Sequence, residues 1–120
     1  METSDWSFWV AVDTIVGSSE IVIDRPKGSH HPHFPSIVYP VDYGYLANTR
    51  SMDGGGIDVW AGSLDRTKVV GIICTVDLQK RDSEIKVLLG CTAEETDKAH
   101  RFLNAGGQMK GLLIRRGQRT

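Results

Sequence analysis

The stretch KVVGIICTVDL, from Lys68 to Leu78, is nearly all apolar and contains no proline. A continuous apolar run of this length, bounded by polar turn residues, is typical of a strand that is buried on both faces. Valine and isoleucine, which favour strands, make up much of it. The sequence therefore predicts a central strand of a sheet at this position.

The segments that follow predict a second strand, a helix and a last strand. The polar turn QKRDS leads to EIKVLLGC, residues 84–91, which has the length and composition of a strand. Thr92 is placed to cap a helix of sequence TAEETDKAHRFLNAGG, with acidic residues in its first turn and glycine at its end. The last predicted strand is KGLLIRR, residues 110–116.

Two segments before the central strand also predict β structure. GIDVWAGSL, residues 56–64, is predicted as one strand. SIVYPVDYGYL, residues 36–46, predicts two β segments that are broken at Pro40, followed by a turn through Asn48 and Ser51.

The N-terminal part predicts a helix, a short strand and a loop. The helix opens at Ser4 and ends at Gly17. EIVID, residues 20–24, is a short strand that stops at Pro26, because proline cannot donate to a sheet ladder. Residues 28–35 contain three histidines and two prolines and are predicted as an extended loop. The stripe of the helix that we expect in the core comprises Trp6, Trp9 and Val10.

Several short strands with a few helices, and without a regular βαβ alternation, predict an α+β, mainly β fold. We expect a small closed β-barrel with an N-terminal helix and a C-terminal helix packed outside it. A chain of 120 residues is large enough for one core, so residues 1–120 are predicted to form a single domain.

Charge and composition exclude several classes of function. The chain has 14 basic and 15 acidic residues and no evidently basic face, which argues against partners such as nucleic acid or an anionic membrane. Cys74 and Cys91 lack CxxC spacing, so we expect buried, reduced thiols and a cytoplasmic protein. No signal peptide and no apolar stretch of ~18 residues is present, which predicts a soluble protein.

Aspartates fall where the predicted strands end. Asp53 and Asp58 flank the glycines of SMDGGGIDVW, Asp77 ends the central strand, and Asp82 follows after a short turn. Clustered carboxylates suit a hard cation such as Mg²⁺. Aspartate is also the commonest turn residue, so each of these positions is equally typical of a local cap or turn. Both interpretations stay open at this point.

YPVDYGYL, followed eight residues after Tyr45 by DGGGID, resembles the soluble family I inorganic pyrophosphatases. The hallmark of that family is YPxxYG(F/Y) followed by a DGDPxD motif. The resemblance extends over residues 21–89, with a looser match to the following helix, and marks the chain as a shortened, divergent member. It implies a pyrophosphatase-like or OB-like barrel whose mouth holds several Mg²⁺ ions on aspartates, where a metal-bridging water attacks pyrophosphate.

The resemblance also implies roles for individual residues. The implied metal ligands, for Mg²⁺ or alternatively Mn²⁺, are Asp24, Asp53, Asp58, Asp77 and Asp82. The implied phosphate-binding residues are Tyr39 and Tyr43, and we expect Lys27 and Lys86 to bind phosphate in place of cations that the family has at other positions. Tyr43 and Asp58 are the implied catalytic residues.

The chain departs from the family at the proton acceptor and at the phosphate contacts. Gly55 stands where the family has the second aspartate of its motif, the carboxylate proposed to take a proton from the nucleophilic water. The family's lysine two residues beyond the last aspartate is Glu84 here, although Lys86 shares that strand face. Where the final helix of a pyrophosphatase supplies a tyrosine and a lysine, this chain has Ala105 and Gly106.

The segment between Asp24 and Tyr39 has about half the family's usual length, so the hairpin that carries a phosphate-binding lysine and arginine is cut back. SHHPHF, residues 29–34, occupies part of this segment. One interpretation is that His30, His31 or His33 faces the carboxylates and replaces the missing cations, as a phosphate donor or a metal ligand; His31 and His33 are the predicted substrate-binding residues. The other is an exposed polar loop that its prolines hold extended.

These observations predict a metal-dependent, inorganic pyrophosphatase-like hydrolase, weak or of altered substrate preference, that acts on a small phosphate-containing substrate. The alternative is a non-catalytic module that keeps the barrel and binds a metal, a phosphate compound or a protein. A homo-oligomer is expected in either case.

Overall fold

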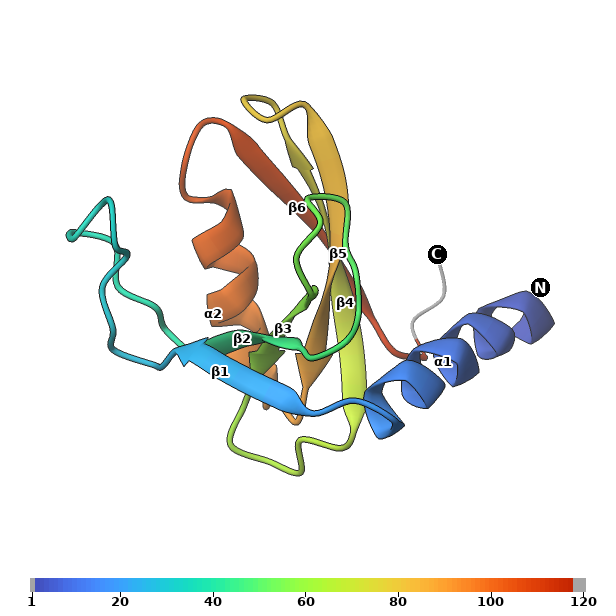
Figure 1. Ribbon diagram of the computed structural model, residues 1–120. Coiled ribbons are helices and arrows are strands. Elements are labelled where there is room, and N and C mark those ends of the chain that lie inside the picture. Colours follow the sequence, from blue (N-terminus) through green and yellow to red (C-terminus); the bar gives the residue numbers. More distant parts are fainter. Residues whose placement is uncertain (1, 118–120) are drawn as a thin grey trace.

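Residues 2–117, which the computed structural model describes, form two helices and a six-stranded sheet (Figure 1). In chain order the elements are α1 (Glu2–Gly17), β1 (Ile21–Arg25), β2 (Asp42–Leu46), β3 (Ile57–Ala61), β4 (Val69–Asp77), β5 (Asp82–Leu89), α2 (Ala93–Asn104) and β6 (Met109–Arg115). The predicted mainly β fold is confirmed. The β segment predicted before Pro40 is not a strand, because Val38 forms only an isolated bridge with His30 there.

The order of strands in the sheet is β1-β2-β3-β5-β4-β6. Neighbours are antiparallel except β3 and β5, which run parallel. The edge strands β1 and β6 do not pair with each other within residues 2–117, so the sheet is open. The closed barrel expected from the sequence is therefore not confirmed, because closure needs hydrogen bonds between the first and the last strand.

The strands β3, β4 and β5 bury both of their faces over part of their length, where their sequences are most apolar. One hydrophobic cluster includes Trp9 of α1 and, among its strand residues, Val59, Ile72 and Val87 of three neighbouring strands. A second cluster includes Leu103 of α2 and takes the next residue of each strand: Trp60, Ile73 and Leu88. Successive strand residues point to opposite faces, so the two helices lie against opposite faces of the sheet (Figure 1).

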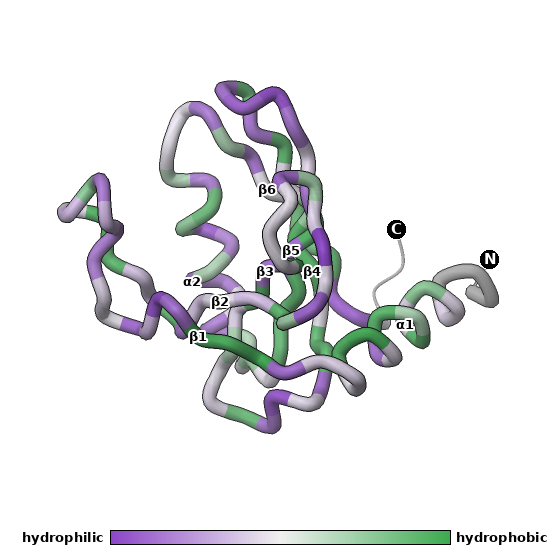
Figure 2. The backbone as a smooth tube through the Cα atoms, viewed as in Figure 1, coloured by the Kyte–Doolittle hydropathy of each residue, from purple (hydrophilic) through white to green (hydrophobic). Residues whose placement is uncertain are grey.

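The helix α1 extends away from the sheet, and only part of it is buried (Figure 1). Trp9 is 8% exposed, whereas Trp6 is 67% exposed, so the expected core stripe is confirmed for Trp9 and wrong for Trp6 and Val10. Figure 2 shows α1 as mostly hydrophobic, in contrast to the hydrophilic turn between β4 and β5. No helix within residues 2–117 is both long and apolar enough to cross a membrane.

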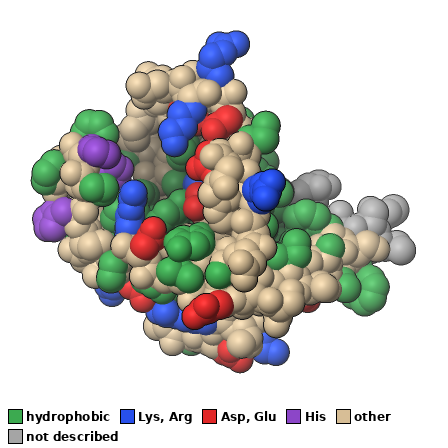
Figure 3. Space-filling view, in the orientation of Figure 1, with side chains coloured by type: hydrophobic (Ala, Val, Ile, Leu, Met, Phe, Trp, Pro, Cys, Tyr) green, Lys and Arg blue, Asp and Glu red, His purple; other side chains and the backbone are tan. Residues whose placement is uncertain are grey.

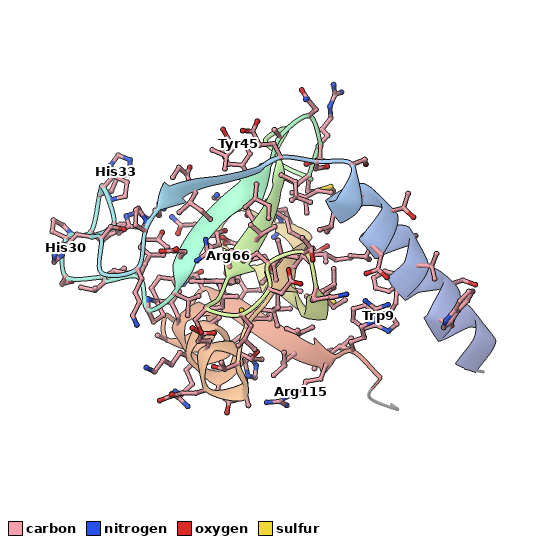
Figure 4. The ribbon with its side chains drawn as sticks, turned by 90° about the horizontal axis from the view of Figure 1, so that it is seen from below. Trp9, His30, His33, Tyr45, Arg66 and Arg115 are labelled. Atoms are coloured by element: carbon pink, nitrogen blue, oxygen red, sulfur yellow. The ribbon has the colours of Figure 1, made fainter. Side chains whose placement is uncertain are left out.

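Trp9 lies where α1 meets the rest of the molecule (Figure 4), and Arg116, the residue that follows β6, holds it there. The guanidinium of Arg116 donates to both carboxylate oxygens of Asp13, at 2.7 and 2.8 Å. It also lies 5.6 Å from the centre of the Trp9 ring. The ion pair lowers the pKa of Asp13. A bidentate pair next to a cation–π contact fixes the orientation of the helix as well as its position.

The helix α2 begins with the capping box that its sequence predicts. The backbone N–H of Glu95 donates to Thr92 Oγ1 at 3.1 Å, and the N–H of Thr92 donates to Glu95 Oε1 at 2.8 Å. The N–H of Ser63 also donates to this carboxylate, which ties α2 to the loop after β3. Burial acts to raise the pKa of Glu95, but these hydrogen bonds outweigh it and lower that pKa.

Replacing Thr92 with alanine should lower the free energy of unfolding by ~1 kcal/mol, because the N–H of Glu95 loses its acceptor. Urea unfolding of the variant measures this loss. Thr92→Ser, which keeps the hydroxyl, is the matched control and should stay close to the parent. An alanine variant as stable as the serine variant would show that the cap contributes nothing to this helix.

Candidate functional site

A polar pocket of about 260 Å³ lies among β1, the loop before β3 and the adjoining ends of β4 and β5. All five aspartates that the sequence predicted as metal ligands line it: Asp24, Asp53, Asp58, Asp77 and Asp82. Tyr43 and Lys86, predicted to bind phosphate, line it as well. Figure 3 shows acidic and basic side chains gathered around a hollow on this face. We call this the carboxylate pocket.

A register shift in β1 explains how two consecutive residues reach this pocket. Ile23 pairs with Gly44 and Arg25 pairs with Tyr43, so Asp24 is the additional residue of a β-bulge. In a regular strand Asp24 and Arg25 would face opposite sides of the sheet. The bulge allows both side chains to line the carboxylate pocket, which is a common use of bulges at functional sites.

Lys86 places a positive charge inside the carboxylate pocket. Its side chain is 5% exposed, and Nζ lies 2.7 Å from Asp58 Oδ2, 3.3 Å from Glu84 Oε1 and 3.2 Å from the hydroxyl of Tyr43. Burial acts to lower the pKa of Lys86, but Tyr43 and Asp58 outweigh it and raise that pKa above its ordinary value. The ammonium group therefore stays charged at physiological pH and neutralises carboxylates that would otherwise repel one another.

Glu84 lies on the same face of β5 as Lys86, because residues two apart in a strand share a face. Its side chain is 9% exposed. One carboxylate oxygen pairs with Lys86, whereas Oε2 is buried and has no hydrogen-bond partner among the residues that the structure describes. An unsatisfied buried acceptor is costly, so this oxygen is available to a cation or a donor that enters the pocket.

Tyr43 keeps its phenolic proton in this environment. Burial is the main cause that raises its pKa, and the carboxylate of Asp58 contributes in the same direction, against the effect of Lys86. The hydroxyl group is thus a hydrogen-bond donor at neutral pH and is not a base. A role of Tyr43 as a proton acceptor is therefore not supported by its surroundings.

Two of the aspartates also hold local turns, as the alternative interpretation of the sequence required. Asp53 Oδ1 accepts from Ser51 Oγ at 2.8 Å and from the N–H of Gly55 at 2.9 Å, and these bonds lower its pKa. Asp77 Oδ1 accepts from the N–H groups of Gln79 and Lys80. Within residues 2–117 no three metal-binding side chains stand close enough to form a ready-made cation site.

The remaining predicted phosphate-binding residues lie outside the carboxylate pocket. Lys27 lies on an open surface beside Lys98 and Arg101. Tyr39 and His31 line a second, aromatic pocket next to the first. His33 lies in the outlying part of the histidine loop, away from the sheet (Figure 4).

The histidine loop turns back on itself and is not simply extended. The N–H of Gly28 donates to the carbonyl of Tyr39, the N–H of Tyr39 donates to Ser29, and the N–H of His31 donates to Ile37. These hydrogen bonds hold the connection between β1 and β2 as a compact loop. The loop therefore presents His31 to the aromatic pocket and not to the carboxylates.

Sequence reasoning missed Arg25, Lys80 and Thr75 as residues of the carboxylate pocket. Thr75 is two residues before Asp77 in β4 and so shares its face, which the strand period alone predicts. Arg25 depends on the bulge in β1, which has no signal in a single sequence.

Solved structures of bacterial enzymes share this arrangement of strands and helices. An inorganic pyrophosphatase from Coxiella burnetii matches with a TM-score of 0.54 and 15% identity, over 80% of this chain and 84% of that chain. An inorganic pyrophosphatase from Helicobacter pylori matches with a TM-score of 0.53 and 17% identity, over 81% of this chain and 82% of that chain. The fold is therefore pyrophosphatase-like.

At this low identity the likeness concerns the fold alone. No family model matches the chain, and no curated protein sequence matches it. The activity must therefore be argued from the residues of the site.

Proposed function

We propose that this protein is a divalent-metal-dependent hydrolase of phosphoanhydrides, of the inorganic pyrophosphatase type, which converts diphosphate and water to two phosphates. The observation that carries the proposal is that five aspartates from separate segments line one pocket together with Arg25, Lys80 and Lys86. Carboxylates and cations side by side suit a metal–phosphate complex, because each group finds the opposite charge there.

The residue types of the pocket suit a divalent cation, and binding one would draw the carboxylates closer together than they stand within residues 2–117. Carboxylate oxygens are the ligands that Mg²⁺ and Mn²⁺ prefer, and the buried, unpartnered Oε2 of Glu84 is an acceptor without a donor among the described residues. The residues that would hold the ion are Asp24, Asp53, Asp58, Asp77 and Asp82. A bound ion of this kind lowers the pKa of a coordinated water and so supplies a nucleophile at neutral pH.

The chain's own cations and donors would bind the substrate. Arg25 and Lys86 neutralise phosphate charge, which is the main requirement of phosphoryl transfer. The hydroxyl of Tyr43, protonated at neutral pH, donates a hydrogen bond to a phosphate oxygen. Lys86 also orients Asp58 through their 2.7 Å contact. Position 55 has no side chain to accept the proton of an attacking water, so we expect slow turnover.

The second candidate function is a non-catalytic module that binds a metal or a phosphate compound. It is favoured by Gly55 and by the use of Asp53 and Asp77 in turns. Phosphate release from pyrophosphate with Mg²⁺ or Mn²⁺ distinguishes the two functions. A purified protein that binds the metal and releases no phosphate would be the module and not the enzyme.

Asp58→Asn and Asp82→Asn should each weaken Mg²⁺ or Mn²⁺ binding by ~10-fold or more, a loss seen even for residues that only orient ligands. Calorimetric titration of the metal into the protein measures the effect. Asp65→Asn is the matched control, because Asp65 is exposed in a loop and accepts its bonds from Thr67. Identical isotherms for the parent and both pocket variants would exclude the metal site.

A further inference from the structure

An aromatic pocket of about 300 Å³ adjoins the carboxylate pocket. Four of its rings contact one another: Tyr39, Tyr43, Trp60 and Phe102. Ring centres are 4.9 Å apart for Tyr39 and Phe102, and 4.6 Å apart for Tyr43 and Trp60. Tyr39 and Trp60 are almost fully buried, so the cluster is a rigid wall and not a set of mobile surface side chains.

The two pockets share part of their lining. Arg25, Tyr43 and Lys86 line both, together with Met109. A ligand that lies in both pockets at once would therefore have two cations and a phenolic donor at its middle. This arrangement fits a molecule with one anionic end, one planar apolar end and phosphate in between.

The polar groups of the aromatic pocket suit a heterocycle better than a hydrocarbon. The indole N–H of Trp60 is buried and has no hydrogen-bond partner among the described residues. Because Trp60 is 0% exposed, the polar groups that a ligand in this pocket reaches are those of the half-buried Arg25 and His31, and both can hydrogen-bond to a heterocycle. Aromatic walls with a few hydrogen-bonding groups are also the usual means of holding an unstacked nucleobase.

His31 contributes a neutral wall on the loop side. Its ring is nearly parallel to that of Tyr39, at an angle of 9°. Nδ1 accepts from the N–H groups of His33 and Phe34, so the proton of the neutral ring is on Nε2. Burial, Arg25 and His33 lower the pKa of His31, so the ring is mostly uncharged at pH 7. An uncharged ring suits contact with a base and does not suit the phosphate-binding role considered from the sequence.

The size of the aromatic pocket limits what it holds. A volume of about 300 Å³ is at the lower end of the range for ligand sites and matches a base, whereas the sugar and phosphates need further space. Gly106, which lines the pocket, keeps it open because no side chain enters from this position.

We propose that the substrate is a nucleoside diphosphate, with its base in the aromatic pocket and its phosphates in the carboxylate pocket. The inference rests on the proposed hydrolase function. In the reaction, the oxygen of water forms a bond to the terminal phosphorus, and the bond from that phosphorus to the bridging oxygen breaks. The products are a nucleoside monophosphate and inorganic phosphate, and the bridging oxygen leaves with the electron pair while water gives up a proton.

Two non-hydrolysable probes separate the base from the phosphates. α,β-Methylene-ADP carries both, and methylenediphosphonate carries only the diphosphate part. In calorimetric titrations with Mg²⁺ we expect α,β-methylene-ADP to bind ~10-fold more tightly, because stacking of one base contributes about 5- to 150-fold in affinity. Equal affinity, or no binding of either probe, would overturn the inference.

A matched pair of glycine variants tests whether the base binds in the aromatic pocket. A Cβ at Gly106 or at Gly107 would meet no described atom within 4 Å, and neither residue has a left-handed backbone, so both accept leucine. Gly106 lines the aromatic pocket and Gly107 does not. We expect Gly106→Leu to remove the ~10-fold preference, and Gly107→Leu to keep it. A preference that survives Gly106→Leu would place the base elsewhere and overturn the inference.

A second variant and a separate assay keep the outcomes distinct. Phe102→Leu removes one ring while keeping apolar bulk, and we expect it to reduce the same preference even if Gly106→Leu fails to fold. Phosphate release from ADP and from pyrophosphate tests the hydrolase itself. A preference for α,β-methylene-ADP without phosphate release would refute the enzyme and retain the nucleotide site. Phosphate release without this preference would retain the enzyme and refute the nucleotide site.

Discussion

Replacing Lys86 with methionine should lower the free energy of unfolding by about 3 to 5 kcal/mol, the cost of removing one partner from a buried ion pair. The ammonium group is the hydrogen-bonding partner of both Asp58 and Glu84, and its side chain is 5% exposed. Methionine has a similar length and no charge, so the packing stays and the two carboxylates are left unneutralised. Urea unfolding in the presence of a chelator measures the loss.

A divalent cation should restore part of the stability of Lys86→Met. With the ammonium group gone, Asp58 and Glu84 face each other across a space that a cation can occupy, and an ion that binds only the folded state stabilises it by mass action. Millimolar Mg²⁺ or Mn²⁺ should therefore stabilise the variant more than it stabilises the parent. This difference would show that Lys86 and a metal ion neutralise the same carboxylates.

Lys98→Met is the control for this experiment. Lys98 is 41% exposed and makes an i,i+4 pair with Glu94 on the surface of α2. Such a pair contributes only ~0.3–0.5 kcal/mol, so its loss should be small and should not respond to metal. If Lys86→Met were as stable as Lys98→Met, the buried charge would not be holding the pocket together.

The order and type of the elements were predictable because they follow from local pattern. The apolar runs of β4 and β5 supply residues to the clusters on both faces of the sheet, and Thr92 and Glu95 form the box that their spacing predicts. The open sheet was not predictable, because closure depends on whether β1 and β6 meet, and the pairing of distant strands leaves no mark in either strand alone.

The candidate site was predictable at the level of its residues and not of its contacts. The aspartates line one pocket because the strands that carry them, or that follow them, are close together in the sheet, so their common pocket follows from the topology. The ion pair of Lys86 with Asp58 joins residues that are 28 positions apart and depends on the parallel pairing of β3 with β5. The exposure of Trp6 was missed because helical spacing fixes a face and does not say how far along the helix that face is covered.

Under the proposed function, replacing Gly55 with aspartate should raise the rate of Mg²⁺-dependent pyrophosphate hydrolysis by ~10²-fold, the lower end of the gain from a positioned general base. The backbone permits the change. Gly54 has a φ of +88°, whereas Gly55 lies outside the left-handed region. A Cβ at Gly55 would meet one described atom within 4 Å, Asp53 Oδ1 at 3.3 Å, which is at the far end of an exposed side chain.

The position of that Cβ makes the prediction specific. Asp53 lines the carboxylate pocket, so a carboxylate at position 55 would stand beside it. Two adjacent negative charges repel, and we therefore expect Gly55→Asp to be less stable than the parent in chelator and to regain stability with Mg²⁺. The rate gain should appear only in the metal-bound protein.

Gly55→Asn is the variant that separates basicity from shape. Asparagine has the size of aspartate and nearly the same hydrogen-bonding geometry, but its amide does not take up a proton at neutral pH. Steady-state phosphate release should therefore rise for Gly55→Asp and stay at the parent rate for Gly55→Asn. If the two folded variants turned over at the same rate, proton transfer at position 55 would not limit the reaction. The binding of phosphate by Arg25 and Lys86 would then be the next property to vary.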